Sequence, residues 1–131
     1  MPLALAVGRG DLTLPRALRL PRVREDRMVL VDARDTDLGE HRLLENSAVT
    51  RTSVIDLPRV VPTEGDIYVH VAVDVCTPAQ IPDLLHPAEG GSDVADVLAA
   101  VRPQAHGAGA GPAGRRRVNP AQRRARGWLV A

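Results

Sequence analysis

The most constraining feature of this sequence is the stretch from Asp66 to Gly91, in which an apolar run leads into a proline-rich segment. Its first half, 67–75, reads IYVHVAVDV and is rich in β-branched and apolar residues at both sets of alternating positions. This pattern is typical of a strand buried on both faces, as in a parallel α/β sheet. Ligands of open α/β sheets bind outside the carboxyl ends of the strands, so Asp74 is a candidate site residue. The alternative is that Asp74 only caps a turn, the commoner role of an aspartate at a strand end.

The segment around Asp74 resembles the second metal motif of the arginase/agmatinase (ureohydrolase) family. In that family a strand ends in Asp-x-Asp-x-x-Asp-Pro, and a proline-rich loop, a Gly-Gly pair and a helix follow. Ala72 and Thr77 stand where the family has two further aspartates. The resemblance implies a binuclear manganese centre, with Asp74 as the one ligand of this motif that can be carried over. The matching residues are Asp74, Pro78, Pro82, Pro87, Gly90 and Gly91.

Two other segments resemble the same family. Residues 1–11 (MPLALAVGRGD) are similar to its Gly-Met-Pro-Leu-Ala segment, and residues 34–40 are similar to its Arg-Asp-x-Asp-Pro-Gly-Glu segment. The family's upstream ligands, a His and an Asp-x-His-x-Asp run, have no counterpart around any of the four histidines, which are His41, His70, His86 and His106. We therefore expect an incomplete chain that corresponds to the later part of the fold and starts at an internal Met.

The local patterns predict an α/β fold. The resemblance implies, more specifically, a partial three-layer arginase-type fold with a parallel sheet. Strands are expected at 28–31, 48–57 and 67–75, and short helices near the N-terminus, at 40–47 and at 93–101. Leu43 and Leu44 should face the sheet, Val94, Val97, Leu98 and Val101 should form an apolar helix face, and Ser92 should cap that helix.

Four carboxylates follow the strand at 28–31 and could suggest a site for a hard cation, which prefers oxygen ligands. They are Asp32, Asp35, Asp37 and Glu40. The favoured interpretation is local: Asp35 or Asp37 caps the helix that begins near Leu38, and Glu40 interacts with its positive end. We predict no separate metal site here.

The charge distribution divides the chain. Residues 102–131 contain seven arginines and no carboxylate, whereas residues 1–101 contain 10 basic and 16 acidic residues. We predict a partial ureohydrolase-like domain over 1–101 and a flexible, disordered Gly/Ala/Arg-rich tail over 102–131. Such a tail could bind nucleic acid by neutralising phosphates, but it offers only Trp128 for stacking, so nucleic acid is not the favoured partner.

The remaining features favour an ordinary cytoplasmic protein without a membrane partner. The single Cys76 is expected to be a packed, inert thiol, which is consistent with a reducing compartment. No apolar run approaches the roughly 20 residues of a membrane span, and no signal peptide is evident. His70 is expected to be buried and hydrogen-bonded, and His41 to be exposed.

The resemblance implies a protein related to the manganese-dependent hydrolysis of C–N bonds in guanidino and amidino compounds. Most metal ligands are missing, so we expect this chain to be inactive unless a partner chain supplies them. No catalytic residue is assigned, Asp74 is the candidate metal ligand, and the substrate-binding residues are unknown. The alternatives are a non-catalytic interaction remnant and nucleic-acid binding through the tail. A guanidino or amidino compound is the expected small-molecule partner if the chain is active, and homo-oligomers could form through free strand edges.

Overall fold

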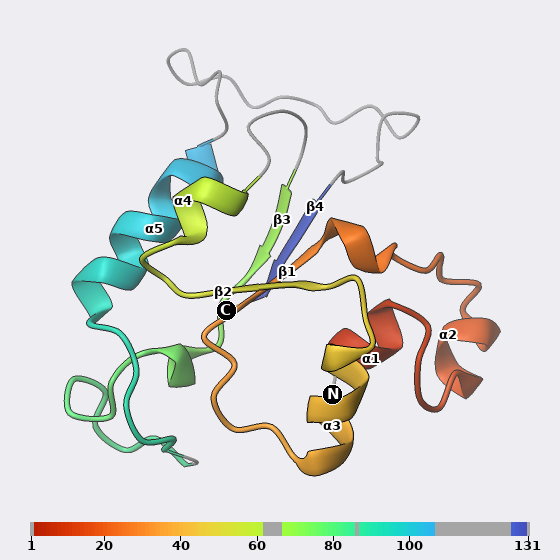
Figure 1. Ribbon diagram of the computed structural model, residues 1–131, viewed down its shortest axis with the longest axis horizontal. Helices are drawn as coiled ribbons and strands as arrows, with labels where there is room; N and C mark the ends of the chain where they lie inside the picture. Colours follow the sequence, from red (N-terminus) through yellow and green to blue (C-terminus); the bar gives the residue numbers. More distant parts are fainter. Residues whose placement is uncertain (1, 62–66, 86, 107–126, 131) are drawn as a thin grey trace.

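A computed structural model describes residues 2–61, 67–85, 87–106 and 127–130, and the structural statements below concern these residues. Helices and short strands alternate along the chain (Figure 1). In chain order the elements are α1 (Pro2–Ala6), α2 (Thr13–Ala17), η1 (Glu25–Arg27), β1 (Met28–Val31), α3 (Leu38–Glu45), β2 (Thr50–Thr52), α4 (Leu57–Val60), β3 (Ile67–His70), η2 (Val73–Val75), α5 (Val94–His106) and β4 (Gly127–Val130).

The strands form one parallel sheet in the order β2-β1-β4-β3. Val29 of β1 lies opposite Thr50 of β2 on one side and opposite Leu129 of β4 on the other. Leu129 in turn lies opposite Val69 of β3. The predicted α/β class with a parallel sheet is therefore confirmed, and the last strand of the chain lies inside the sheet (Figure 1).

All four residues of β1 are buried, because each face of this strand contacts a different hydrophobic core. Val29 and Val31 belong to the core that includes Leu57 of α4 and Val97 of α5. Met28 and Leu30 pack with Leu3 of α1 on the opposite face, where Leu44 of α3 joins them. The fold thus has three layers, with α4 and α5 on one side of the sheet and α1 and α3 on the other (Figure 1).

The strand predicted at 67–75 is wrong in length and in burial. It ends at His70, and a 3₁₀ turn (η2) follows at Val73–Val75. In the described sheet β3 is an edge strand whose one neighbour is β4. Burial alternates along β3, with Tyr68 and His70 exposed and Ile67 and Val69 packed against the core. The predicted burial of His70 is therefore wrong, and the strand buried on both faces is β1.

The predicted disordered tail over 102–131 is wrong at both of its described ends. Helix α5 continues through Pro103 to His106, so the proposed domain boundary after Val101 falls within a helix. Residues 127–130 form β4, which pairs with two strands. The basic cluster at 115–126 lies outside the described residues.

The helix predicted at 40–47 is observed as α3, and its predicted cap is confirmed. The Asp37 carboxylate accepts a hydrogen bond of 2.7 Å from the Glu40 N–H. His41 is exposed, as expected. Leu44 packs against the core but Leu43 is 46% exposed, so only one of these two leucines faces the sheet as predicted.

The cap predicted for α5 is wrong. The helix begins at Val94, whose N–H donates to the side-chain oxygen of Gln80 at 2.8 Å. The Ser92 hydroxyl donates to the Asp32 carboxylate instead. On the predicted apolar face Val97 is buried, but Leu98 is 47% exposed and Ala100 takes its place in the core. The strand predicted at 48–57 is shorter, because Val54 and Leu57 enter the core from a turn and from α4.

Replacing Leu129 by Pro should abolish cooperative folding of the chain. Proline removes a backbone donor from a strand with a neighbour on each side, where it is essentially never tolerated. Urea denaturation followed by circular dichroism measures the effect, and Leu129→Val is the matched control that keeps the ladder intact. An L129P variant with an unchanged transition would show that β4 does not hold the sheet together.

Candidate functional site

The candidate site lies at the carboxyl edge of the sheet, where the segments after β1 and β3 meet. Asp32 directly follows β1 and adopts a left-handed conformation with φ of 47°, which aspartate tolerates better than most residues. Its N–H donates to the carbonyl oxygen of Thr52 at 3.0 Å, which prolongs the β1–β2 ladder by one bond. The chain then turns away from the sheet with the Asp32 side chain held at the edge.

The half-buried Asp32 carboxylate connects three segments of the chain. Its Oδ2 accepts a hydrogen bond from the Ser92 hydroxyl at 3.0 Å and a longer one from the Val54 N–H at 3.4 Å. Ser92 immediately precedes α5, and Val54 follows β2. Through its Oδ2 atom the carboxylate therefore connects the loop after β2 with the segment before α5.

Arg34 makes the second tie, toward the loop after β3. Its Nη2 donates to the backbone carbonyl oxygen of Asp74, 40 positions away in the sequence. Its Nη1 is buried and has no hydrogen-bond partner within the described part of the chain. Within that part the guanidinium places a fixed positive charge beside the residue predicted as the metal ligand.

The Gly-Gly pair brings the segment before α5 against the segment after β3. Gly91 has φ of +102°, and a Cβ there would lie 2.6 Å from the Cys76 carbonyl oxygen and would also clash with Arg34. Backbone hydrogen bonds fix this approach: Ser92 N–H donates to Val75 O at 3.1 Å, and Thr77 N–H donates to Ser92 O at 2.9 Å. Only glycine combines this backbone conformation with this distance.

The predicted site residues are not brought together around a cation. Asp74 is exposed in η2 and not at a strand end, and Asp37 is the cap of α3. Among the described residues no group of three or more His, Cys, Asp or Glu side chains is placed to hold a metal ion. Cys76 is buried in the core, which confirms that it is a packed thiol.

The donor set in the described residues therefore does not fit a binuclear manganese centre, and Asp74 as a ligand stays a prediction. Sequence reasoning missed Arg34 and the Asp32–Ser92 contact. Both contacts join segments that are 40 and 60 positions apart. No local pattern indicates such a distant partner.

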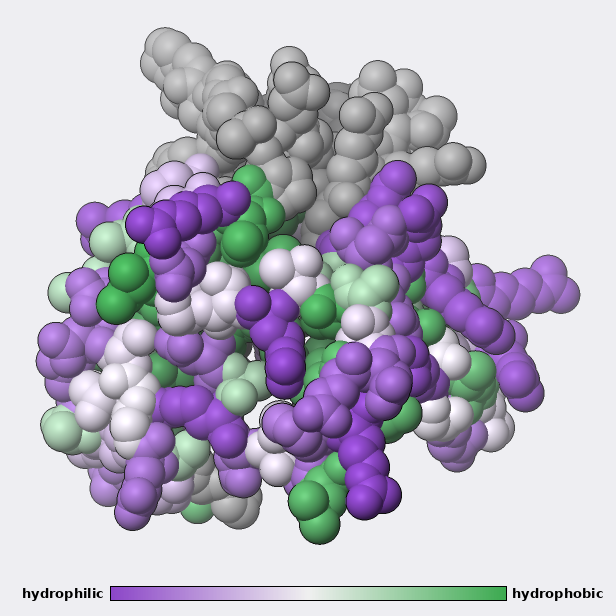
Figure 2. Space-filling model, in the orientation of Figure 1, coloured by the Kyte–Doolittle hydropathy of each residue, from purple (hydrophilic) through white to green (hydrophobic). Residues whose placement is uncertain are grey.

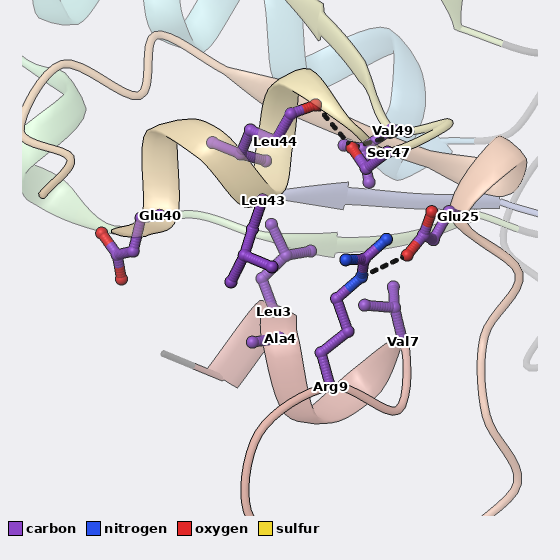
Figure 3. Close-up of a pocket in the computed structure, with 10 residues that line it drawn as sticks. All are labelled: Leu3, Ala4, Val7, Arg9, Glu25, Glu40, Leu43, Leu44, Ser47 and Val49. Atoms are coloured by element: carbon purple, nitrogen blue, oxygen red, sulfur yellow. Dashed lines mark hydrogen bonds and ion pairs between the residues drawn. The ribbon is translucent and has the colours of Figure 1, made fainter. Parts of the chain in front are cut away.

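A small cavity of about 50 Å³ lies between α1 and α3, away from this edge (Figure 3). Its walls are mostly apolar, and the Arg9–Glu25 ion pair, with an Nε to Oε1 distance of 2.6 Å, lies at its side. Ligand sites usually measure about 300–1,000 Å³, so this cavity is a packing gap and not a substrate site. Its lining residues are Leu3, Ala4, Val7, Arg9, Glu25, Glu40, Leu43, Leu44, Ser47 and Val49.

Comparison with known proteins adds no family assignment. No family model matches the chain, and no significant match was found among the curated proteins or the solved structures. The helices in the described ranges include none that is both long and apolar enough to span a bilayer.

Alanine substitutions at Gly90 and Gly91 should distinguish the energetic cost of a left-handed backbone from the cost of a steric clash. Gly90→Ala should cost about 1 kcal/mol, because φ is +77° but a Cβ would lie no closer than 3.8 Å to its nearest neighbour among the described residues, Arg34 Nη1. Gly91→Ala should cost about 3 kcal/mol or more, because the new methyl group would also clash with the Cys76 backbone. Urea titrations of both variants test this, and equal losses would contradict the close approach at Gly91.

Glu25 should make the stability of the protein depend on acidity. Hydrogen bonds from the Arg9 side chain and from the Ala48 N–H lower the pKa of Glu25 below its ordinary value of 4.5. A lowered folded pKa adds stability above the unfolded pKa, and this stability is lost as the pH falls through the folded pKa. Between about pH 6 and pH 3, Glu25→Gln should therefore lose less stability than the wild type, as measured by urea midpoints. Asp35→Asn is the matched control, because Asp35 is exposed and is not a partner in the ion pairs of the described residues. Parallel profiles of wild type and E25Q would contradict the role of Glu25.

Proposed function

We propose that this chain is an arginase-family, ureohydrolase-like α/β protein that is not catalytic by itself. The family hydrolyses C–N bonds of guanidino and amidino compounds with manganese-bound hydroxide. The motif around Asp74, with its proline-rich loop and Gly90–Gly91, supports the family membership. The parallel sheet is compatible with it.

One observation supports the absence of catalysis: Asp32 and Arg34, two polar residues at the carboxyl edge, form hydrogen bonds within the protein. Asp32 accepts from Ser92 and Val54, and Arg34 donates to the Asp74 carbonyl. A divalent cation near Asp74 would lie close to the Arg34 guanidinium, and like charges at short distance repel each other. A metal pair needs several carboxylate and imidazole ligands, and Asp74 alone would give only weak affinity.

The glycines explain how the motif can be present without a complete ligand set. Gly91 is required by the close approach of the segment before α5 to Cys76, whether or not a metal is bound. The backbone path of the loop can thus be kept without the metal ligands. This chain retains the glycine that the backbone path requires.

Purified protein should not bind manganese tightly. Calorimetric titration should show no site with a micromolar or better dissociation constant, and urea should not be released from arginine or agmatine. The double variant Ala72→Asp/Thr77→Asp, which restores the two carboxylates of the motif, should remain inactive because the other ligands are still missing. Two tight manganese sites in the wild type, or urea release, would overturn the proposal.

A further inference from the structure

A groove of about 620 Å³ lies between α1 and α2, on the side of the molecule away from the carboxyl-edge loops. Its floor is apolar, and two of its leucines, Leu14 and Leu20, are 65% and 56% exposed. Such exposure of large apolar side chains around one hollow is typical of an interaction site. The groove is lined by Leu5, Ala6, Gly8, Leu12, Leu14, Pro15, Arg16, Arg19, Leu20, Pro21, Arg22 and Val23.

The rim of this groove is positively charged. Arg16, Arg19 and Arg22 line it together with no carboxylate, and none of the three forms an ion pair within the described residues. The sequence from 12 to 24 contains four arginines and no Asp or Glu. Figure 2 shows hydrophobic surface beside hydrophilic side chains at this end of the molecule. The groove therefore fits an occupant that is both apolar and acidic.

The chain itself contains a segment with those properties. Leu85 is 91% exposed, and the exposed Asp83 and Glu89 lie on either side of it in the sequence. Asp83 adopts a left-handed conformation with φ of 63°, which defines a sharp turn before Leu84 and Leu85. From 60 to 101 the sequence contains seven carboxylates and no Arg or Lys. We call residues 82–85 and 87–89 the acidic loop.

The acidic loop cannot reach the groove of its own molecule. The loop follows η2 and leads toward α5, whereas the groove lies beside α2, and the two are at opposite sides of the fold (Figure 1). A second molecule can bring its loop to the groove. The complementary charges and the exposed leucines are then matched in one contact.

We infer that the arginine-rimmed groove between α1 and α2 binds the acidic loop of a second copy of this chain. Leu85 enters the apolar floor near Leu14 and Leu20, and Asp83 and Glu89 face the arginines of the rim. The two surfaces are different, so the contact is head-to-tail and builds rings or open chains of molecules. The inference concerns another surface than the carboxyl edge, and it holds whether or not the protein is ureohydrolase-like.

Sedimentation velocity of the full chain at low and high salt tests the inference. At about 50 mM salt the protein should associate with increasing concentration, and at about 500 mM salt the association should weaken at least about tenfold, because exposed charge pairs are screened. The groove variant Arg16→Glu/Arg19→Glu and the loop variant Leu85→Asp should each be monomeric. Circular dichroism checks that both variants keep the wild-type fold.

A mixture of the two variants is the decisive sample. The intact groove of the loop variant should bind the intact loop of the groove variant, and the two altered surfaces, both acidic, should repel each other. The mixture should therefore form a one-to-one dimer that does not grow further. Arg42→Glu/Arg51→Glu is the matched control, because it makes the same charge change outside the groove and should still associate.

Three outcomes would overturn the inference. The wild type could remain monomeric at about 50 mM salt at every concentration tested. Association could persist in both variants and at high salt, as expected for pairing through β3, which is an edge strand of the described sheet. The wild type could be monomeric yet bind phosphatidylserine vesicles in a way that the groove variant does not, which would assign the groove to an anionic membrane surface.

Discussion

The pairing of β4 with both β1 and β3 is the interaction on which the rest of the structure depends. In the described sheet β3 has β4 as its partner, so β4 alone connects β3 to the other two strands. Two ladders form on four residues, and the entropic cost of closing the long connection before them grows only slowly with its length. Helix α5 contacts β3, and its Val97 lies in the core together with Val29 and Val31 of β1.

Strand β1 then determines where the polar residues of the carboxyl edge lie. Its alternating side chains contribute to two cores, so its position is fixed from above and below. Asp32 and Arg34 follow within three residues of its end and inherit that position. Their ties to Ser92 and to the Asp74 carbonyl then bring the loops after β3 against the same edge. The sheet that contains β1 thus depends on β4, and the positions of the residues at the carboxyl edge depend on β1.

The parts of this fold that could be predicted from sequence are those with a local cause. The four apolar residues of β1 and the cap of α3 by Asp37 each depend on neighbours within a few positions. The run 67–75 is apolar enough for a central strand, but whether it is central or at the edge depends on where β4 inserts. The sequence of β4, GWLV, is short, follows an Ala/Gly/Arg-rich stretch and carries no periodic signal. The capping of α5 by Gln80 and the reach of Arg34 to Asp74 depend on tertiary structure and have no local pattern.

The carboxyl edge shows how a sequence can resemble a metal-binding motif while the residues described do not form a metal site. A strand–loop–helix connection imposes two kinds of requirement: a backbone path, met here by glycine at 91, and side chains that perform chemistry at the end of that path. The first requirement is satisfied by packing against Cys76 and remains whatever is bound. The side chains that would perform chemistry are not in place among the described residues; Arg34 and Asp32 instead form hydrogen bonds within the protein. Asp32 and Arg34 hold the loops together at this edge, and the described residues place no group of three metal-binding side chains there. We therefore look for binding by this chain at the arginine-rimmed groove between α1 and α2.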